Sequence, residues 1–154
     1  MSTEGVSIDR YVLLEDLTGA DAGPGVRLWR GRDLVLDREV SIRLLDVVDA
    51  RAPAFGSAAR AAAMVDDRRL LRILDVMEVP EFAAVPRSIG VVSEWARGRS
   101  LSEALVDREW EPFSISDAII IVADVARAIS AGLACGVSHG RLRPSSVVIT
   151  DAGE

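Results

Sequence analysis

The order of the predicted strands and helices constrains the fold of this chain more than any other feature. Apolar and polar residues alternate in Val26–Trp29 and in Val40–Leu45, as in strands that bury one face, and Tyr11–Leu17 has the composition of a strand. Short segments rich in turn-forming residues separate the three, which predicts an antiparallel meander. Because helices dominate the second half of the chain, we predict an α+β fold.

The remaining elements are predicted from local signals. The alanine-rich segment Phe55–Val65 is predicted to be a short helix. Leu70–Val79 and Ser88–Trp95 are predicted to be strands, and Arg97–Arg99 is predicted to be a turn.

Two later helices have recognisable ends. Ser100 and Glu103 form a capping-box pattern that opens a short helix. Ser114 is predicted to cap a longer helix that runs to about Ala134, and Gly136 is placed to end it. The apolar side chains of the longer helix recur at the 3.6-residue spacing of a buried stripe: Ile115, Ile119, Val122, Val125, Ala126, Ile129 and Leu133.

Composition and charge narrow the class of protein. The chain has 154 residues, of which 49% are hydrophobic, so it is long enough for one domain with a core. A net charge of −6 argues against binding to nucleic acid, since tracking phosphates needs a basic surface. We expect no membrane segment within the chain, because the longest apolar run, Ala118–Ala123, is too short. We also find no signal peptide in Met1–Asp9 and predict a cytoplasmic protein, with Cys135 as a small core residue.

The segment His139–Thr150 resembles the catalytic loop of a protein kinase, which has the pattern H-R-D-L-K-P-x-N followed by a short apolar strand. The frame is kept at His139, Leu142 and Pro144. Arg141 stands where the catalytic aspartate belongs, and Ser146 stands where the metal-binding asparagine belongs. The family uses that aspartate to accept the substrate hydroxyl proton and the asparagine to hold Mg²⁺.

Two further catalytic positions are also changed. All 18 Lys+Arg residues of the chain are arginines, and in Val40–Arg43, which resembles the kinase strand V-A-I-K, Arg43 takes the place of the lysine. The helix glutamate that pairs with this lysine in the family falls on Ala58. The resemblance therefore implies a pseudokinase that is not an enzyme, with no catalytic residues, no bound metal and no cofactor.

The resemblance covers roughly residues 10–154 and implies a protein kinase-like architecture. Residues 1–9 would be a loose tail, residues 10–95 an antiparallel five-stranded N-lobe with one helix, and residues 96–154 the hinge and the first part of a helical C-lobe. The chain ends before the D-F-G segment, which predicts a fragment. Part of the helix stripe would then face water, so we expect a dimer or a missing C-lobe.

A candidate nucleotide pocket follows from the resemblance. Its residues map to the positions that surround adenine and the phosphates in kinases, with Ser93 as gatekeeper of the hinge: Leu28, Ser41, Arg43, Ser93, Glu94, Ala96 and Val148. The segment that would be the glycine-rich loop matches the kinase pattern G-x-G-x-x-G poorly. Its three glycine positions fall on Asp21, Gly23 and Val26, with Pro24 between them.

Within the kinase-like family, Arg27–Val40 resembles the pseudokinase domain attached to MviN/MurJ-type lipid-II flippases of actinobacteria. The cue is a tryptophan in the second strand followed by D-x-x-L-D-R-x-V, which begins at Asp33. This resemblance implies a regulatory scaffold that recruits a forkhead-associated (FHA) protein, once phosphorylated on threonine, in the control of peptidoglycan synthesis. Segments outside this chain could hold it at the inner face of the membrane.

Several alternatives stay open on the sequence alone. The domain could be a nucleotide-sensing pseudokinase with weak ATP binding, or a weakly active Ser/Thr kinase. Arg43 either contacts a phosphate or pairs with a carboxylate, and Arg141 either binds phosphate or is solvated or bonded to backbone. His139 is expected to pack beneath the catalytic loop, and Trp29 and Trp95 are expected to pack in the core or at the hinge.

Overall fold

The structure is a computed structural model that describes residues 6–19, 22–83 and 85–151. The chain folds into two compact units. The first contains residues 6–63 and Leu71–Trp95, and the second contains Met64–Leu70 and residues 96–151. Residues 1–5 of the predicted tail lie outside the described part of the chain.

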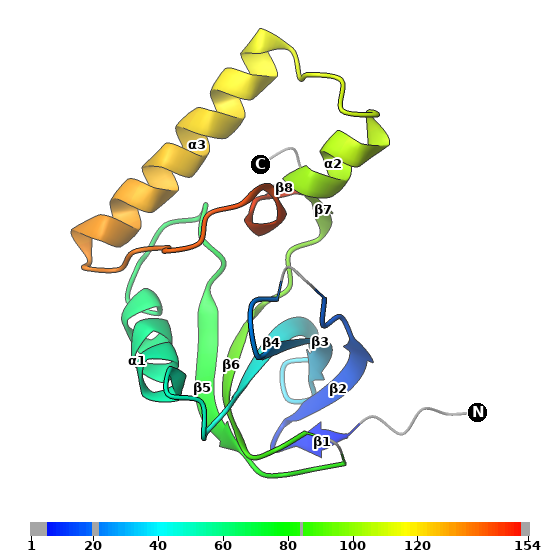
Figure 1. The fold of residues 1–154 in the computed structure, drawn as a ribbon, viewed down its shortest axis with the longest axis vertical. Helices are drawn as coiled ribbons and strands as arrows, with labels where there is room; N and C mark the ends of the chain where they lie inside the picture. The colour runs from blue at the N-terminus through cyan, green and yellow to red at the C-terminus, as the bar shows by residue number, and fades with distance from the viewer. Residues whose placement is uncertain (1–5, 20–21, 84, 152–154) are drawn as a thin grey trace. The chain divides into compact units, whose positions relative to one another are not determined.

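The first unit is built on a curled antiparallel sheet with the strand order β1-β2-β3-β4-β6-β5 (Figure 1). Its strands are β1 (Ser7–Ile8), β2 (Tyr11–Asp16), β3 (Val26–Asp33), β4 (Arg38–Asp46), β5 (Ile73–Val79) and β6 (Ser88–Glu94). The meander of β2, β3 and β4 confirms the predicted antiparallel succession. The strand predicted from Leu70 begins only at Ile73, and Leu70 belongs to the second unit.

The sheet has six strands rather than the predicted five, because part of the expected tail joins it. Ser7 and Ile8 pair with Val12 and Tyr11 of β2, and the backbone N–H of Leu13 donates to the Val6 carbonyl at 2.9 Å. Ile8 is only 5% exposed and lies in the core. The burial of this one aliphatic side chain stabilises the pairing of the two-residue strand β1 with β2.

Alternate residues of β4 supply the centre of the core. Val40, Ile42 and Leu44 have at most 1% of their surface exposed, and they pack with Tyr11 and with other strands. Trp29 of β3 packs against the same cluster, as predicted. Since side chains alternate across a strand, the residues between them, Ser41 and Arg43 included, lie on the opposite face of the sheet.

The turn between β3 and β4 explains much of the D-x-x-L-D-R-x-V pattern. The Asp33 carboxylate is fully buried and accepts the backbone N–H groups of Val35 at 3.1 Å and Leu36 at 3.2 Å. It also forms ion pairs with Arg10 at 3.1 Å and with Arg38 at 3.7 Å. In this chain the pattern therefore shapes and anchors a hairpin turn.

Helix α1 (Ala52–Ala62) packs beside β5 and β6 (Figure 1). It begins and ends three residues before the predicted Phe55–Val65, because Pro53 lies in the first turn, where a residue without an N–H is well tolerated. The helix buries only small residues, Ala52, Gly56 and Ala59. An added Cβ on Gly56 would lie 3.5 Å from Ile89 of β6, so the helix approaches the sheet closely.

The second unit contains two helices and a two-stranded antiparallel sheet. Its elements are β7 (Gly98–Ser100), α2 (Leu101–Asp107), α3 (Ile115–Ala134), the 3-10 turn η1 (Pro144–Ser146) and β8 (Val148–Thr150). The prediction of a turn over Arg97–Arg99 was wrong for its last two residues, because Gly98 and Arg99 pair with Thr150 and Ile149. An added Cβ on Gly98 would lie 2.1 Å from the Ile149 carbonyl oxygen, so only glycine permits this approach.

The helix ends match the sequence prediction. Ser100 and Glu103 form the complete capping box, and the Ser114 hydroxyl accepts the backbone N–H of Asp117 at 3.1 Å. At the end of α3, Gly136 has a φ of +73° and the N–H of Val137 donates to the Gly132 carbonyl at 2.9 Å. This is the hydrogen-bonding pattern of a glycine-terminated helix.

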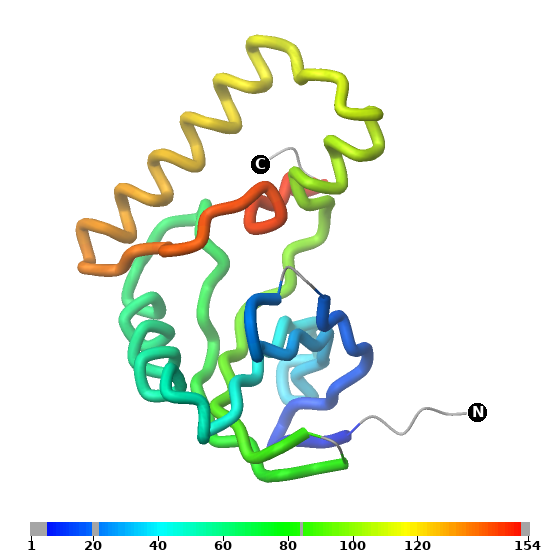
Figure 2. Tube along the Cα trace, in the orientation of Figure 1, coloured from blue at the N-terminus to red at the C-terminus, as the bar shows by residue number. Residues whose placement is uncertain are grey.

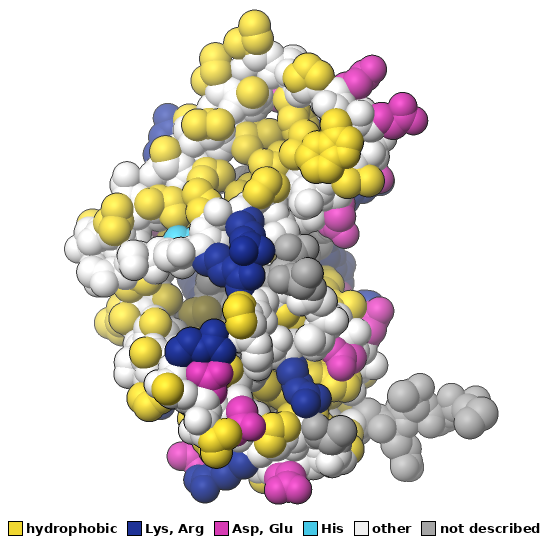
Figure 3. Space-filling view, in the orientation of Figure 1, with side chains coloured by type: hydrophobic (Ala, Val, Ile, Leu, Met, Phe, Trp, Pro, Cys, Tyr) yellow, Lys and Arg dark blue, Asp and Glu magenta, His cyan; other side chains and the backbone are white. Residues whose placement is uncertain are grey.

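Much of the apolar surface of α3 faces water, as predicted. Ile115, Ile119, Val122 and Leu133 are 58–82% exposed, and the helix buries only Ala128 and Gly132. Figure 3 shows apolar side chains gathered over this part of the molecule. The prediction for Cys135 was wrong: this residue is exposed, because it caps the end of the helix rather than continuing its buried side.

Candidate functional site

Four of the candidate nucleotide residues lie on one face of the first unit's sheet. Leu28 of β3 is directly opposite Arg43 of β4, and Ser41 of β4 is directly opposite Ser93 of β6. Because cross-strand partners share a face, the strand register places an aliphatic side chain, a cation and two hydroxyl groups together. The opposite face of the same strands is the apolar core.

Arg43 is a cation without a counter-charge in the described part of the chain. No hydrogen bond or ion pair joins its guanidinium to a described residue, and burial lowers its pKa. Helix α1 contains no acidic residue, and Ala58, which the resemblance predicts for the glutamate position of kinases, is exposed. The alternative in which Arg43 pairs with a carboxylate is therefore not seen among the described residues.

Ser41 and Ser93 place two buried hydroxyl groups on the sheet face that carries Arg43. Ser93 is 1% exposed and Ser41 is 7% exposed. The Ser93 hydroxyl has no hydrogen-bond partner among the described residues. A buried hydroxyl without a partner costs free energy, so this arrangement leaves a polar group free for a ligand or a water molecule.

Glu94 lies on the other face of the sheet from Ser93, and Ala96 and Val148 belong to the second unit. The Glu94 carboxylate accepts the backbone N–H of Arg72 at 2.8 Å and so holds the start of β5, and Glu94 pairs with Val40 on the core side. Ala96 and Val148 belong to the second unit, where both are partly buried. Val148 is opposite Ser100 in the β7–β8 pair.

The glycine-rich loop is tied to the connection between β4 and α1. Arg51 donates to the Pro24 carbonyl at 2.7 Å, and Asp49 holds the Arg51 guanidinium with contacts of 2.9 and 2.6 Å. Hydrogen bonds from the Arg51 side chain and backbone lower the pKa of Asp49 to about 2. An added Cβ on Gly25, whose φ is +70°, would lie 3.1 Å from the same guanidinium. Asp21 lies outside the described residues.

A hollow of about 480 Å³ lies beneath this loop. Thr18, Gly23 and Gly25 line it, together with the carboxylates Asp16 and Asp46. The described lining includes none of the candidate nucleotide residues. Its described lining carries three carboxylates, with Asp49 as the third, against the single guanidinium of Arg27, so its net negative charge disfavours a phosphate.

The loop that resembles the catalytic loop has an ordered backbone in the second unit. The Ser146 hydroxyl donates to the Arg141 carbonyl at 3.3 Å, and the Arg141 N–H donates to His139 Nδ1 at 3.3 Å. The expectation that His139 packs beneath the loop was wrong, because its side chain is exposed and organises the turn from outside. Arg141 and Ser146, which the resemblance predicts for the aspartate and asparagine positions, thus contact each other, and neither is acidic.

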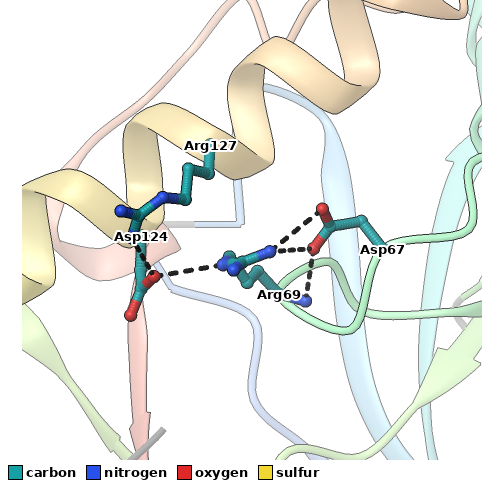
Figure 4. Close-up of polar contacts among 4 residues, drawn as sticks. All are labelled: Asp67, Arg69, Asp124 and Arg127. Carbon is teal, nitrogen blue, oxygen red and sulfur yellow. Dashed lines mark hydrogen bonds and ion pairs between the residues drawn. The ribbon is translucent and has the colours of Figure 1, made fainter.

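A charged network in the second unit was missed by the sequence analysis (Figure 4). Arg69 reaches Asp124 of α3 at 3.1 Å and Asp67 at 3.2 Å, and Arg127 donates to Asp124 at 3.1 Å. The hydrogen bond from Arg69 is the main cause that lowers the pKa of Asp124. The network fixes the segment Met64–Leu70 to α3, although its neighbours in sequence belong to the first unit.

Neither a metal-binding cluster nor a membrane-spanning helix is found within the described ranges. No three or more histidine, cysteine, aspartate or glutamate side chains are grouped so that they could hold a metal ion there. Among the same residues, no helix has the length and apolar character needed to cross a membrane.

Comparison with known proteins identifies the fold. No protein-family model matches the chain. A probable serine/threonine-protein kinase of Corynebacterium efficiens is 28% identical over 155 residues, and the serine/threonine-protein kinase pkn3 of Myxococcus xanthus is 29% identical over 149 residues. These alignments cover 96% and 94% of the chain but only 22% and 26% of the relatives. The chain therefore spans about a quarter of their length or less.

Solved structures give the same result for the backbone. Two crystal structures of the Mycobacterium tuberculosis PknI kinase domain match with TM-scores of 0.77 and 0.78, at 17% and 18% identity. The matches cover 97% of this chain and 59% and 58% of those chains. The chain has a protein kinase-like fold, with the curled antiparallel sheet of the N-lobe followed by a few helices. Its relatives in sequence are bacterial serine/threonine kinases.

Proposed function

We propose that this kinase-like domain is catalytically inactive and works as a regulatory binding module. The observation that carries the proposal is the loop at His139–Ser146, where Arg141 and Ser146 occupy the positions of the aspartate and the asparagine. Phosphoryl transfer depends on positioned metal ions and a base for the hydroxyl proton, and neither residue can supply them. Arg43 and the acid-free helix α1 support the same conclusion, because the lysine–glutamate pair has no equivalent.

A phosphotransfer assay tests the inactivity. The purified chain is incubated with γ-labelled ATP and Mg²⁺, alone and with a general protein substrate, and labelled protein is counted. We expect no transfer above a no-protein blank. Reproducible transfer that disappears in the Arg141→Ala variant would contradict the proposal, because that outcome makes Arg141 part of a working catalytic site.

The proposed partner is an FHA-domain protein, in a role that controls peptidoglycan synthesis. The support is the resemblance of Arg27–Val40 to the MviN/MurJ-associated pseudokinase domain, which in that family is phosphorylated on threonine. The test compares binding of an isolated FHA domain to the chain before and after treatment with an active serine/threonine kinase and ATP. Binding that is absent after threonine phosphorylation has been verified would remove this part of the proposal.

A second candidate function is nucleotide sensing with weak ATP binding. It is favoured by the free guanidinium of Arg43 and the unpartnered hydroxyl of Ser93 on one face of the sheet. The test is a thermal shift with ATP and ADP, each with and without Mg²⁺, because a ligand that binds only the folded state raises the melting temperature. We expect a shift that does not require Mg²⁺ and that falls in the Arg43→Gln variant. No shift at millimolar nucleotide would exclude this function.

A further inference from the structure

The loop between α3 and β8 is a basic, largely exposed stretch of an acidic chain. The eleven residues Val137–Val147 contain His139, Arg141 and Arg143 and no acidic residue, whereas the whole chain has a net charge of −6. Figure 2 shows this segment running from the end of α3 back to β8. His139 and Arg143 are exposed and Arg141 is partly exposed, so all three can meet a ligand in solvent.

The backbone of this loop is held in place by its own hydrogen bonds. Besides the contacts of His139 and Ser146 with Arg141, the Ser146 N–H donates to the Arg143 carbonyl at 2.9 Å. Gly140, with a φ of +68°, makes the tight turn between His139 and Arg141. The basic side chains are therefore displayed on a preorganised backbone, which lowers the entropic cost of binding.

The guanidinium groups of this loop have no partner in the described part of the chain. Neither Arg141 nor Arg143 forms a side-chain hydrogen bond or ion pair with a described residue. By contrast, Arg99 and Arg127 in the same unit contact Asp107 at 2.5 Å and Asp124 at 3.1 Å, although both arginines are more than 60% exposed. His139 Nδ1 accepts a hydrogen bond, so Nε2 carries the proton of the neutral ring and is a further donor.

We infer that this loop binds the phosphate group of a phosphorylated serine or threonine in a protein segment. The inference deepens the proposed function, since it names the kind of ligand that an inactive kinase-like module would take. Guanidinium groups match phosphate oxygens in charge and geometry, and the second charge of a phosphate monoester strengthens the contact near neutral pH. In an active kinase the aspartate receives a neutral hydroxyl here. Arg141 reverses the charge and so favours a side chain that already carries phosphate.

A phosphopeptide fits these observations better than a nucleotide does. Nucleotide polyphosphates normally bring Mg²⁺, and the loop has no carboxylate to hold it.

The test is a titration of the full 154-residue chain followed by fluorescence anisotropy. The probes are a labelled phosphothreonine heptapeptide, the same peptide without phosphate, and unlabelled inorganic phosphate and ATP as competitors. The variants are Arg141→Gln and Arg143→Gln. The matched control is Arg60→Gln, which removes the same charge from an exposed position on α1. Circular dichroism confirms that each variant is folded.

We expect the phosphopeptide to bind and its unphosphorylated form not to bind. Each loop variant should weaken binding about tenfold, as the loss of one charge-assisted contact predicts, and Arg60→Gln should leave it unchanged. Absence of phosphopeptide binding would overturn the inference. So would equal weakening by Arg60→Gln, or a loop that binds ATP but not the peptide. Any of these outcomes leaves the proposal of inactivity standing, because the phosphotransfer assay decides that separately.

Discussion

The buried carboxylate of Asp33 provides a quantitative test of how the first unit is held together. It is fully buried, accepts two backbone N–H groups and faces the guanidinium groups of Arg10 and Arg38. In Asp33→Ala the two amide groups lose about 1 kcal/mol each. Loss of the buried negative charge between the two arginines adds roughly another 1 kcal/mol, because both arginine side chains are 34–40% exposed and can regain water.

We therefore expect Asp33→Ala to lose about 3 kcal/mol of unfolding free energy, which corresponds to a fall in melting temperature of roughly 6–12 °C for a chain of 154 residues. Asp33→Asn keeps an acceptor for the Val35 and Leu36 N–H groups and should lose about half as much. The assay is urea unfolding followed by circular dichroism and by tryptophan fluorescence, with Trp29 as a reporter in the core.

Asp37→Asn is the matched control, because Asp37 lies in the same turn and pairs with Arg32, but its side chain is 78% exposed. An exposed pair contributes little, and asparagine tolerates the positive φ of this position, so the control should hardly change stability. If Asp33→Ala loses less than about 1 kcal/mol, or no more than the control, the assignment of Asp33 as the buried anchor of the hairpin is refuted.

Three further predictions concern the loop, the charged network and the exposed helix. The pKa of Asp49 is depressed to about 2 from its ordinary 3.8, so its pairing with Arg51 stabilises the fold above about pH 4 and is lost as the pH falls towards 2. An NMR titration should show this value, and Arg51→Gln should return it towards 3.8; an unchanged value in the variant would contradict the pairing. Arg69→Gln should speed hydrogen exchange at the Leu70 amide, while the β4 amides keep their protection. If exchange at Leu70 stays slow in this variant, the network does not hold the segment Met64–Leu70 to α3. The exposed apolar face of α3 should cause self-association that rises with concentration in sedimentation velocity. Ile119→Glu should reduce this self-association without lowering the melting temperature. A wild-type chain that stays monomeric at high concentration would refute the prediction.

The local sequence predicted the elements whose signals are short in range. The capping box at Ser100, the N-cap at Ser114, the glycine stop at Gly136 and the alternation in β4 were all correct, because each depends on residues within one or two turns or along a single strand. The element boundaries were less accurate, as for α1, where Pro53 starts the helix earlier than the alanine-rich pattern suggested.

For the candidate site, sequence reasoning predicted which residues are changed but not their contacts. The replacements at Arg43, Arg141 and Ser146 are visible in the chain itself. The hydrogen bond between Ser146 and Arg141 and the unpartnered hydroxyl of Ser93 depend on the folded loop and on the strand register. A sequence pattern shows which polar groups are present, and only the folded structure shows which of them have a hydrogen-bond partner.

By itself the sequence determined the fold class, the succession of strands and helices, and the absence of lysine. Only the tertiary structure decided that Ile8 adds a sixth strand, that Asp33 pairs with Arg10, and that Arg69 reaches Asp124 of α3. The physical reason is distance along the chain. Local propensity and capping act between near neighbours, whereas these contacts join residues brought together only when the whole core forms, and their free energy depends on how deeply that core buries them.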